Sequence, residues 1–501
     1  MLLQVESCGI CFSDTKLLHA FDTHPRKSDV VSGIDLDALA EIPSYKPGSQ
    51  PVVPGHEPVG RIVAAGDQVS RFKVGDRVLV QADWKHLRTA KSNGAFGYNF
   101  EGALQEYVVI DERCVVSPSG EEFLIHVTDG PSSAAVGLIE PWATVEGSYA
   151  WKERNHLKDG GRLLVVTDGD AAGLDALTAA HAPKETITLA PADAGSAEGE
   201  FDDIVYYGSD ADVIETLAAH LGTRATMCVV LGGGQIGRKV QLDVGRVHYD
   251  FIRFCGTTGD DPADGYAWIP ETGELRDGDK IAIIGAAGPM GQMHTMRAVT
   301  SGFKDITVAG TDLSDDRLAH LESIVGPVAQ ERGVPLEIIN TGTTELQPGY
   351  THLSCMVPVP ALVSQAVDLA ADGAILNAFA GIPAGTPGEF DLQGIIERRI
   401  FMLGTSGSDV SDMRTVLRKI EEGIIDTHIS LDAVTGMAGF RDAIDSVINR
   451  TSGGKIMVYP ALHDLPLTRL VDMPEKLPHV AAKLNDGVWT KEAEQALLAG
   501  E

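Results

Sequence analysis

Short apolar runs alternate with helical segments through the middle of the chain, and the same order of elements occurs twice. Apolar runs of strand length that alternate with helices predict parallel sheets with helices on both faces. Stretches of equal length, 243–256 and 391–404, close the two copies, which favours a duplication over a general α/β rhythm. The predicted strands are 162–166, 203–207 and 229–234 in the first copy, and 280–284, 352–357 and 375–381 in the second.

The pattern outside these copies is different. Residues 51–80 alternate apolar and polar positions between glycine turns, which is typical of strands in a small β-barrel. Residues 22–50 are rich in Asp, Pro, Ser and Gly and predict a loop, whereas residues 134–150 have a helical pattern. The last three dozen residues predict short surface helices, one of them opened by Thr490.

Length and composition narrow the class of protein. A chain of 501 residues is too long for one hydrophobic core and predicts several domains. The formal charge of −31 repels nucleic acid and anionic lipid, and no run of 18 apolar residues is present to span a bilayer. Six scattered cysteines without a signal peptide argue against a disulfide framework. We therefore expect a cytoplasmic protein that binds neither nucleic acid nor membranes.

Two short motifs contain residues that bind metals. Cys8 and Cys11 form a C-x-x-C pair, and His56 and Glu57 lie side by side after Gly55. An isolated C-x-x-C is more often a packed or redox pair, and an isolated His-Glu pair is more often a surface loop. If the motifs meet, a thiolate and an imidazole favour zinc over magnesium or calcium.

The surroundings of these motifs resemble a known signature. The patterns C-G-I-C-x-S-D from Cys8 and G-H-E-x-x-G from Gly55, followed by Gly66, Val69 and V-G-D-R-V, resemble the zinc-containing medium-chain dehydrogenase/reductase superfamily. The resemblance is closer to the sugar-phosphate and polyol reductases than to simple alcohol dehydrogenases. It implies an α/β protein with a GroES-like β-barrel catalytic domain and a Rossmann-type, doubly wound parallel sheet.

The resemblance also implies domain boundaries. Residues 1–158 correspond to the first part of the catalytic domain and 271–407 to the NAD-binding Rossmann domain. Residues 159–270 are then an additional, degenerate Rossmann-like repeat. The chain returns to the catalytic domain over 408–465 and ends in tail helices over 466–501.

The resemblance assigns roles to individual residues. It implies one catalytic zinc ion, and the absence of cysteine from residues 81–107 excludes the structural zinc of the alcohol dehydrogenases. Ser13 matches the hydroxyl that relays a proton, and Asp14 is a candidate to orient the histidine ring. Glu57 and Glu140 are both candidates for catalytic and metal-binding carboxylates, and the sequence does not decide which of them coordinates. The implied metal ligands are Cys11, His56, Glu57 and Glu140.

A glycine-rich turn in the second copy predicts a dinucleotide site. The pattern of residues 281–291 predicts a strand, a turn and a helix in that order. Backbone N–H groups and the helix dipole at such a turn can hold a pyrophosphate. Asp312, at the end of the next strand, favours NAD over NADP, and Arg317 matches a basic position beside the ribose in relatives. The predicted cofactor-binding residues are Gly285, Gly288, Pro289, Met290, Gly291, Asp312 and Arg317.

The corresponding turn of the first copy has lost the first glycine and carries Asp168 and Asp170, so it is predicted not to bind nucleotide. Its role is open between a spacer, a subunit interface and a lid. The resemblance implies a homo-oligomeric oxidoreductase that transfers a hydride between NAD(H) and a polyol, sugar or sugar phosphate. A zinc-free quinone or enoyl reductase and a non-catalytic NAD(H) sensor or scaffold are the alternatives.

Overall fold

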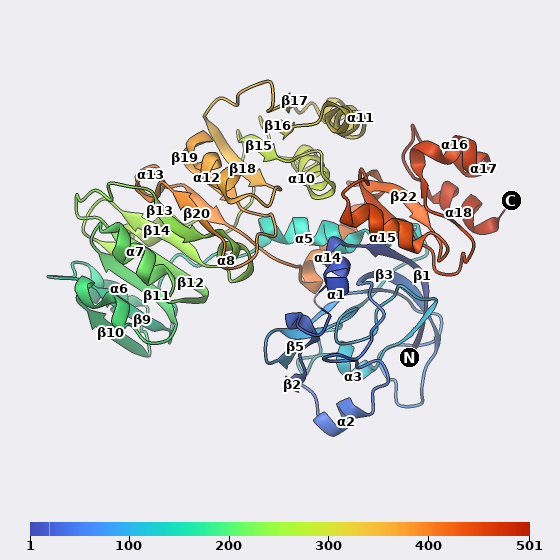
Figure 1. Cartoon of the computed structure of the whole chain (residues 1–501), viewed down its shortest axis with the longest axis horizontal. Helices are drawn as coiled ribbons and strands as arrows, with labels where there is room; N and C mark the ends of the chain where they lie inside the picture. Colours follow the sequence, from blue (N-terminus) through green and yellow to red (C-terminus); the bar gives the residue numbers. More distant parts are fainter. Residues whose placement is uncertain (20, 501) are drawn as a thin grey trace. The chain divides into compact units, whose positions relative to one another are not determined.

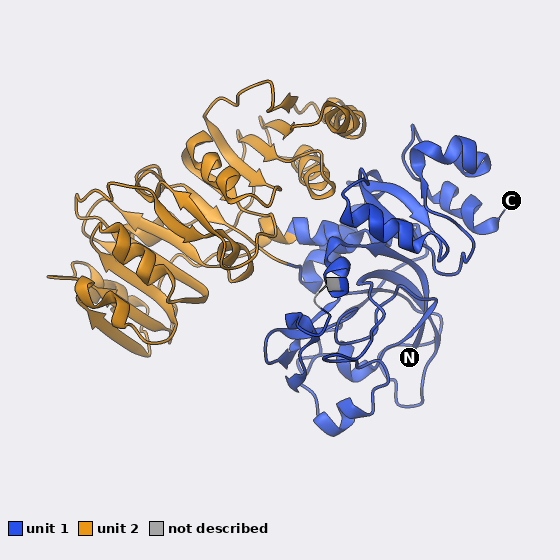
Figure 2. Ribbon diagram, in the orientation of Figure 1, with its two compact units in different colours: residues 1–146, 407–501 blue, residues 147–406 orange. Residues whose placement is uncertain are grey.

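A computed structural model describes residues 1–19 and 21–500. The chain forms two compact units, residues 1–146 with 407–501 (unit 1) and residues 147–406 (unit 2) (Figure 2). Within the described residues, no helix combines the length and the apolar character needed to cross a membrane.

Unit 1 is built on an eight-stranded sheet to which both ends of the chain contribute. β1 (Leu2–Ile10) lies between β3 (Glu57–Ala64) and β23 (Lys455–Val458), with antiparallel pairing on both sides. The closing segment therefore completes the sheet beside the strand that begins the chain. The remaining strands of this sheet are β4 (Arg77–Val80), β7 (Tyr107–Val109), β8 (Leu124–His126), β22 (Leu431–Thr435) and β24 (Thr468–Arg469).

The stretch predicted to be a loop, 22–50, contains short regular elements instead: η1 (Pro25–Lys27), β2 (Val30–Ser32) and α2 (Leu36–Ala40). Side-chain caps and strand pairing account for these short elements. Asp35 accepts from the backbone N–H of Ala38 to start α2, and β2 pairs with β5 (Asp83–Thr89), which pairs with β6 (Asn93–Ala95). Apolar periodicity is too weak a signal for elements this short.

Helices of unit 1 connect the sheet to the C-terminal tail. As predicted, Thr490 caps α18 (Lys491–Ala499), and Glu494 on this helix is buried. Glu494 accepts from the backbone N–H groups of Ser133 (2.6 Å) and Ala134 (2.8 Å), so the tail caps the start of α4 (Ser133–Gly137). The other helices are α1 (Phe12–His19), α3 (Glu112–Val115), α14 (Val410–Glu421), α15 (Phe440–Ile448), α16 (Met473–Lys476) and α17 (Pro478–Ala481), and α5 (Ile139–Ala150) begins in this unit.

Unit 2 contains two all-parallel sheets, one for each predicted copy (Figure 1). The first has the order β10 (Glu185–Leu189), β9 (Arg162–Val166), β11 (Phe201–Tyr207), β12 (Leu221–Val230), β14 (Arg253–Thr257). The second has the order β17 (Leu336–Asn340), β16 (Thr307–Asp312), β15 (Lys280–Ile284), β18 (Tyr350–Cys355), β19 (Ala370–Asn377), β21 (Phe401–Leu403).

The α/β class with Rossmann-like parallel sheets is therefore confirmed. Three predicted strand ends were wrong, because β12 ends at Val230, β18 at Cys355 and β19 at Asn377. In β12, Gly232 and Gly233 adopt left-handed backbone angles that end the strand in a turn. A small antiparallel ribbon joins β13 (Val240–Asp243) of the first copy to β20 (Pro387–Phe390) of the second. The helices are α6 (Leu174–Ala180), α7 (Ala211–Ala218), α8 (Val244–Tyr249) and α9 (Pro262–Ala267), then α10 (Pro289–Val299), α11 (Asp315–Arg332), α12 (Pro360–Leu369) and α13 (Leu392–Arg398).

Candidate active site

The candidate metal ligands of unit 1 meet where β1 ends and α1 begins. Cys11 lies between these two elements, and the buried Asp14 on the first turn of α1 fixes the junction. Its carboxylate accepts from the backbone N–H of Cys11 (2.9 Å) and from that of Gly55 (3.2 Å). One carboxylate thus ties the loop before His56 to the segment that carries Cys11.

Cys11, His56 and Glu57 each place a ligand atom within 4.8 Å of the other two. His56 Nδ1 lies 2.9 Å from Asp14 Oδ1, so Nδ1–H donates to the carboxylate and the lone pair of Nε2 is left for a ligand. Burial would lower the pKa of His56, but the Asp14 carboxylate raises it well above its ordinary value. A metal ion at Nε2 would therefore compete with a proton for the same lone pair.

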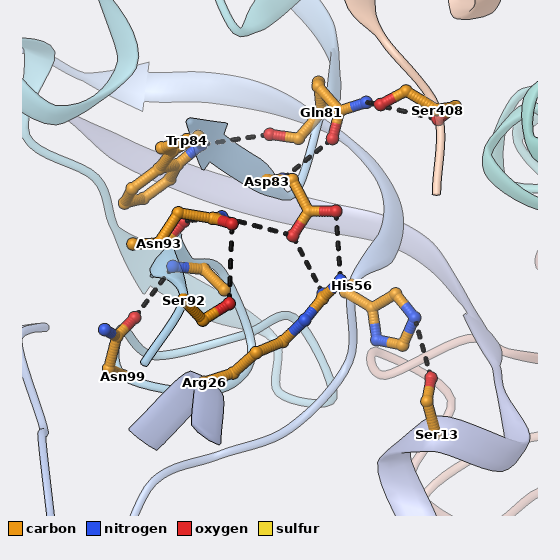
Figure 3. Close-up of polar contacts among 12 residues, drawn as sticks. Ser13, Arg26, His56, Gln81, Asp83, Trp84, Ser92, Asn93, Asn99 and Ser408 are labelled. Carbon is orange, nitrogen blue, oxygen red and sulfur yellow. Dashed lines mark hydrogen bonds and ion pairs between the residues drawn. The ribbon is translucent and has the colours of Figure 1, made fainter. Parts of the chain in front are cut away.

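Ser13 stands beside two of the candidate ligands. Its hydroxyl donates to Cys11 Sγ (3.0 Å) and lies 3.3 Å from His56 Nε2, the contact drawn in Figure 3. The predicted relay residue therefore touches both the thiol and the imidazole.

Glu57 is fully buried and forms an ion pair with Lys455, with 2.6 Å between Oε1 and Nζ. Burial would lower the pKa of Lys455, but the Glu57 carboxylate raises it above its ordinary value. Glu57 Oε2 has no hydrogen-bond partner among the described residues, and it lies 2.1 Å from where a Cβ on Gly9 would be. A side chain at position 9 would therefore displace this carboxylate, and the unpartnered oxygen is suited to a cation.

Glu140 does not belong to the three-residue group. It lies in the first turn of α5, and desolvation raises its pKa to about 7. His56 acts in the opposite direction, and Glu57 raises the pKa further. Because a carboxyl with this pKa takes up and releases a proton near neutrality, Glu140 has the properties of a proton carrier.

A second ion pair borders the site, and sequence reasoning missed it. Arg26 Nη1 lies 2.8 Å from Asp83 Oδ1 (Figure 3). The guanidinium of Arg26 lies over the Tyr98 ring, 5.1 Å from the ring centroid. The ring of Tyr98 is also 5.7 Å from that of His56. Arg26 lies in the stretch that was predicted to be a loop, where nothing in the local sequence marks it; the motif spacing gave no signal for Lys455 either.

In unit 2, the predicted dinucleotide turn joins β15 to α10. Gly285 has a φ of +82°, and Gly288 is the N-cap of α10 with no side chain to cap the helix. A Cβ on Gly291 would lie 2.2 Å from the carbonyl oxygen of Gly285. Pro289 and Met290 lie in the first turn of α10; Pro289 has no N–H, and the N–H groups that follow it at the helix start are available for an anion.

Asp312 and Arg317 flank this turn. Asp312 ends β16, accepts from the backbone N–H of Leu313 (2.8 Å) and lies 3.5 Å from Arg317 Nη2. The same Nη2 is 3.3 Å from where a Cβ on Gly288 would be, so the arginine contacts both the acid and the glycine turn.

The matching turn of the first copy is acidic. Asp168 and Asp170 are exposed, and Gly173, the N-cap of α6, has a φ of +73°. A Cβ on Gly173 would be 2.2 Å from Asp261 Oδ1, so Asp261 brings a third carboxylate to this turn. Three carboxylates here oppose a pyrophosphate.

Comparisons with known proteins agree with this architecture. Residues 1–119 match the model of the alcohol dehydrogenase GroES-like domain. The chain is 28% identical over 249 residues to mannitol-1-phosphate 5-dehydrogenase of Aliivibrio fischeri, which covers 45% of this chain and 57% of that protein. It is 29% identical over 238 residues to (R,R)-butanediol dehydrogenase of Bacillus subtilis, covering 44% and 60%. The chain thus spans less than two thirds of these relatives.

The fold is also found in solved structures. The crystal structure of 2R,3R-butanediol dehydrogenase from Bacillus subtilis superposes with a TM-score of 0.51 at 18% identity and covers 92% of both chains. An alcohol dehydrogenase from Thermotoga maritima gives 0.51 at 13% identity, covering 92% of this chain and 91% of that one. Residues 1–119 thus match an alcohol dehydrogenase GroES-like domain, and the aligned relatives and the fold support the resemblance of the chain to the medium-chain dehydrogenase/reductase superfamily.

Proposed function

We propose that this protein is a zinc-dependent oxidoreductase that interconverts an alcohol and a carbonyl group of a polyol, sugar or sugar phosphate with NAD(H). The observation that carries the proposal is the meeting of a thiol, an imidazole with a fixed tautomer and a carboxylate within 4.8 Å. The substrate class is supported by relatives named for mannitol 1-phosphate and butanediol.

The donor set fits zinc. Sulfur, nitrogen and oxygen ligands from Cys11, His56 and Glu57 would hold the ion and leave one position open, which is the ligand count of a catalytic rather than a structural site. Bound there, zinc would supply a Lewis acid that lowers the pKa of a substrate hydroxyl.

Side chains of the protein would accept and release the proton of the substrate hydroxyl. Ser13 Oγ, in contact with Cys11 Sγ and His56 Nε2, is placed to accept a proton released beside these atoms. Glu140, with a pKa of about 7, can hold a proton near the same group at neutral pH. Asp14 keeps the ring of His56 in the tautomer that directs Nε2 towards Cys11 and Ser13.

For the cofactor, we assign the pyrophosphate to the turn Gly285 to Gly291 and the adenosine ribose to Asp312. The proposal favours NAD, because the Asp312 carboxylate would repel a 2′-phosphate. Arg317, at 3.5 Å from Asp312, offsets part of that repulsion, and we expect NADP to be used weakly rather than not at all.

The test is metal content and activity measured on the same samples. Purified wild-type protein should contain one zinc ion per chain and should oxidise members of a polyol panel with NAD. Cys11→Ala should lose both the zinc and the activity. Cys8→Ala is the matched control, because Cys8 is buried three residues away and lies outside the ligand group. A Cys11→Ala enzyme that keeps its zinc and its activity would contradict the ligand assignment.

Two further outcomes would favour the alternatives. Wild-type protein that turns over substrate without any bound metal would favour the zinc-free quinone or enoyl reductase. Zinc-loaded protein that binds NADH but turns over no substrate would favour the sensor.

A further inference from the structure

The two copies in unit 2 are related residue by residue over the segment that closes each of them. Asp243 caps α8 by accepting from the N–H of Arg246, and Asp391 caps α13 in the same way by accepting from Gly394. Phe251 and Arg399 stand at the same distance beyond these caps, and both are non-glycine residues with left-handed backbone angles, φ 57° and φ 54°. The copies therefore match at a constant spacing, which also relates residues 236–242 to residues 384–390.

When the two copies are matched in this way, each residue pair of the ribbon β13–β20 has another pair of the same ribbon as its counterpart. Val240 pairs with Phe390, and Leu242 pairs with Gly388. Leu242 corresponds to Phe390 in the other copy, and Val240 corresponds to Gly388, so each pair is the counterpart of the other. Reciprocal pairing of this kind is the mark of an isologous contact, in which one surface meets its own equivalent about a two-fold axis.

The axis passes through one pair of residues. Gln241 and Glu389 are counterparts in the two copies, and they are paired with each other, with Gln241 Nε2 donating to Glu389 Oε1 at 3.1 Å. When a residue pairs with its own counterpart, the two-fold axis passes between the two residues.

Contacts away from the ribbon obey the same rule. A Cβ on Gly256 of β14 would lie 2.8 Å from Ile396 Cδ1 on α13, and a Cβ on its counterpart Gly404 would lie 2.9 Å from the Cα of His248 on α8. His248 is the counterpart of Ile396. Each copy thus has a glycine in or directly after its last strand, where a helix of the other copy packs.

A second reciprocal contact involves the same helices. The backbone N–H of Ile236 donates to Gln393 Oε1 at 3.1 Å. The counterpart of Gln393 is Gly245, and a Cβ on Gly245 would lie 2.5 Å from the backbone nitrogen of Ala384, the counterpart of Ile236. Gln393 contacts Ile236 of the other copy, and its counterpart Gly245 lies against Ala384, so the contact is kept although the side chain differs.

The surface between the copies is apolar and closed. β14 and β21, the last strands of the two sheets, contact each other, and buried side chains of both copies belong to one hydrophobic cluster. The members nearest the axis are at most 3% exposed: Val240, Leu242, Val244, Val247, Phe390, Leu392, Ile395 and Ile396. A dry interface of this kind is typical of an obligate pair.

We infer that the first copy is an intramolecular partner: residues 162–257 occupy the face formed by β20, α13 and β21 as a second subunit would, folding a dimer-like interface into one chain. This resolves the open role of the first copy in favour of an interface, made within the chain. It also means that the same face of the dinucleotide-binding copy is closed to a second copy of the protein.

Cysteine cross-linking of the full-length protein tests this inference. Gln241→Cys with Glu389→Cys places two thiols at exposed, directly paired positions, where strand geometry gives a Cα separation of about 4.5–5.5 Å that suits a disulfide. Oxidation, or a short bis-maleimide that needs no disulfide geometry, should link the two within one chain, seen as faster migration on a non-reducing gel. The oligomeric mass measured by light scattering should be unchanged by the link.

Gln241→Cys with Pro387→Cys is the matched control, because Pro387 pairs with Asp243 and is out of register with Gln241. It should cross-link at least ten-fold more slowly. Three results would overturn the inference: a link between two chains, no link with either reagent in correctly folded protein, or a change of oligomeric mass when the link forms.

Discussion

Glu57 and Lys455 lie 398 residues apart in the sequence and form a buried ion pair of 2.6 Å beside the candidate metal ligands. The pair joins β3 to β23, the two strands on either side of β1. It leaves Glu57 Oε2 as an unpartnered buried oxygen among the described residues, next to Cys11 and His56.

Lys455→Met should destabilise unit 1 by about 3–5 kcal/mol in the metal-free protein, because it leaves an unpaired carboxylate in a buried position. Glu57→Gln with Lys455→Met should recover part of that loss, since both charges are then absent. Urea unfolding of the two variants checks this. Equal stability of Lys455→Met and the wild type would show that the pair is not formed in solution.

Glu494→Gln should destabilise unit 1 by about 1.5–3 kcal/mol, because the carboxylate accepts from Ser133 N, Ala134 N and the hydroxyl of Tyr459, and an amide presents a donor to one of these groups. Glu492→Gln, on the exposed side of the same helix, should change stability by less than about 0.5 kcal/mol. Thermal unfolding of both variants is the measurement, and an equal effect of the two would contradict the capping role.

Gly291→Ala should abolish NADH binding, since the added Cβ would lie 2.2 Å from the Gly285 carbonyl and force the dinucleotide turn open. Gly169→Ala, in the matching turn of the first copy, meets no atom within 4 Å and should leave NADH affinity within about two-fold of the wild type. NADH fluorescence titration of the purified variants compares them. If Gly169→Ala lost NADH binding and Gly291→Ala kept it, NADH would bind at the turn of the first copy instead of the second.

Acid should weaken unit 2 through His352. Burial is the main cause that lowers the pKa of His352, from 6.5 to about 4, while Nε2–H donates to the Gly273 carbonyl. Between these values the unfolded chain binds the proton and the folded chain does not, so stability is lost as the pH falls from 6.5 towards 4. The loss at pH 5 should be about 2 kcal/mol. His352→Gln should remove this part of the loss, while the buried His294, whose pKa burial also lowers, keeps its own contribution. Urea unfolding at pH 7 and pH 5 is the measurement, and an unchanged pH dependence would refute the assignment.

Motifs whose residues lie close together in the sequence could be predicted without a structure. Cys11, Ser13 and Asp14 lie on one short segment, and His56 with Glu57 on another, so their joint appearance in a spaced pattern carries information. Their long-range partners do not appear in such patterns. Lys455 and Arg26 reach the site only through strand pairing and loop packing, which local periodicity does not encode.

The same limit applied to the fold. The duplication could be predicted, because strand order and the spacing after Asp243 and Asp391 repeat along the chain. The pairing of β13 with β20 could not, because the register between two copies depends on which surfaces they bury against each other. The short elements within residues 22–50 were missed since side-chain caps and pairing with a distant strand, rather than apolar patterning, define them.

The order of the two copies along the chain gives their interface a consequence during synthesis. Residues 162–257 leave the ribosome before the last strand of the second sheet has been translated, and domains generally fold as they emerge. The surface against which β21 packs is therefore already present when that strand is translated. It is part of the same chain, so no encounter between separate molecules is needed. Assembly of this interface should be independent of how much protein a cell makes, whereas the pairing of two separate polypeptides becomes slower with dilution.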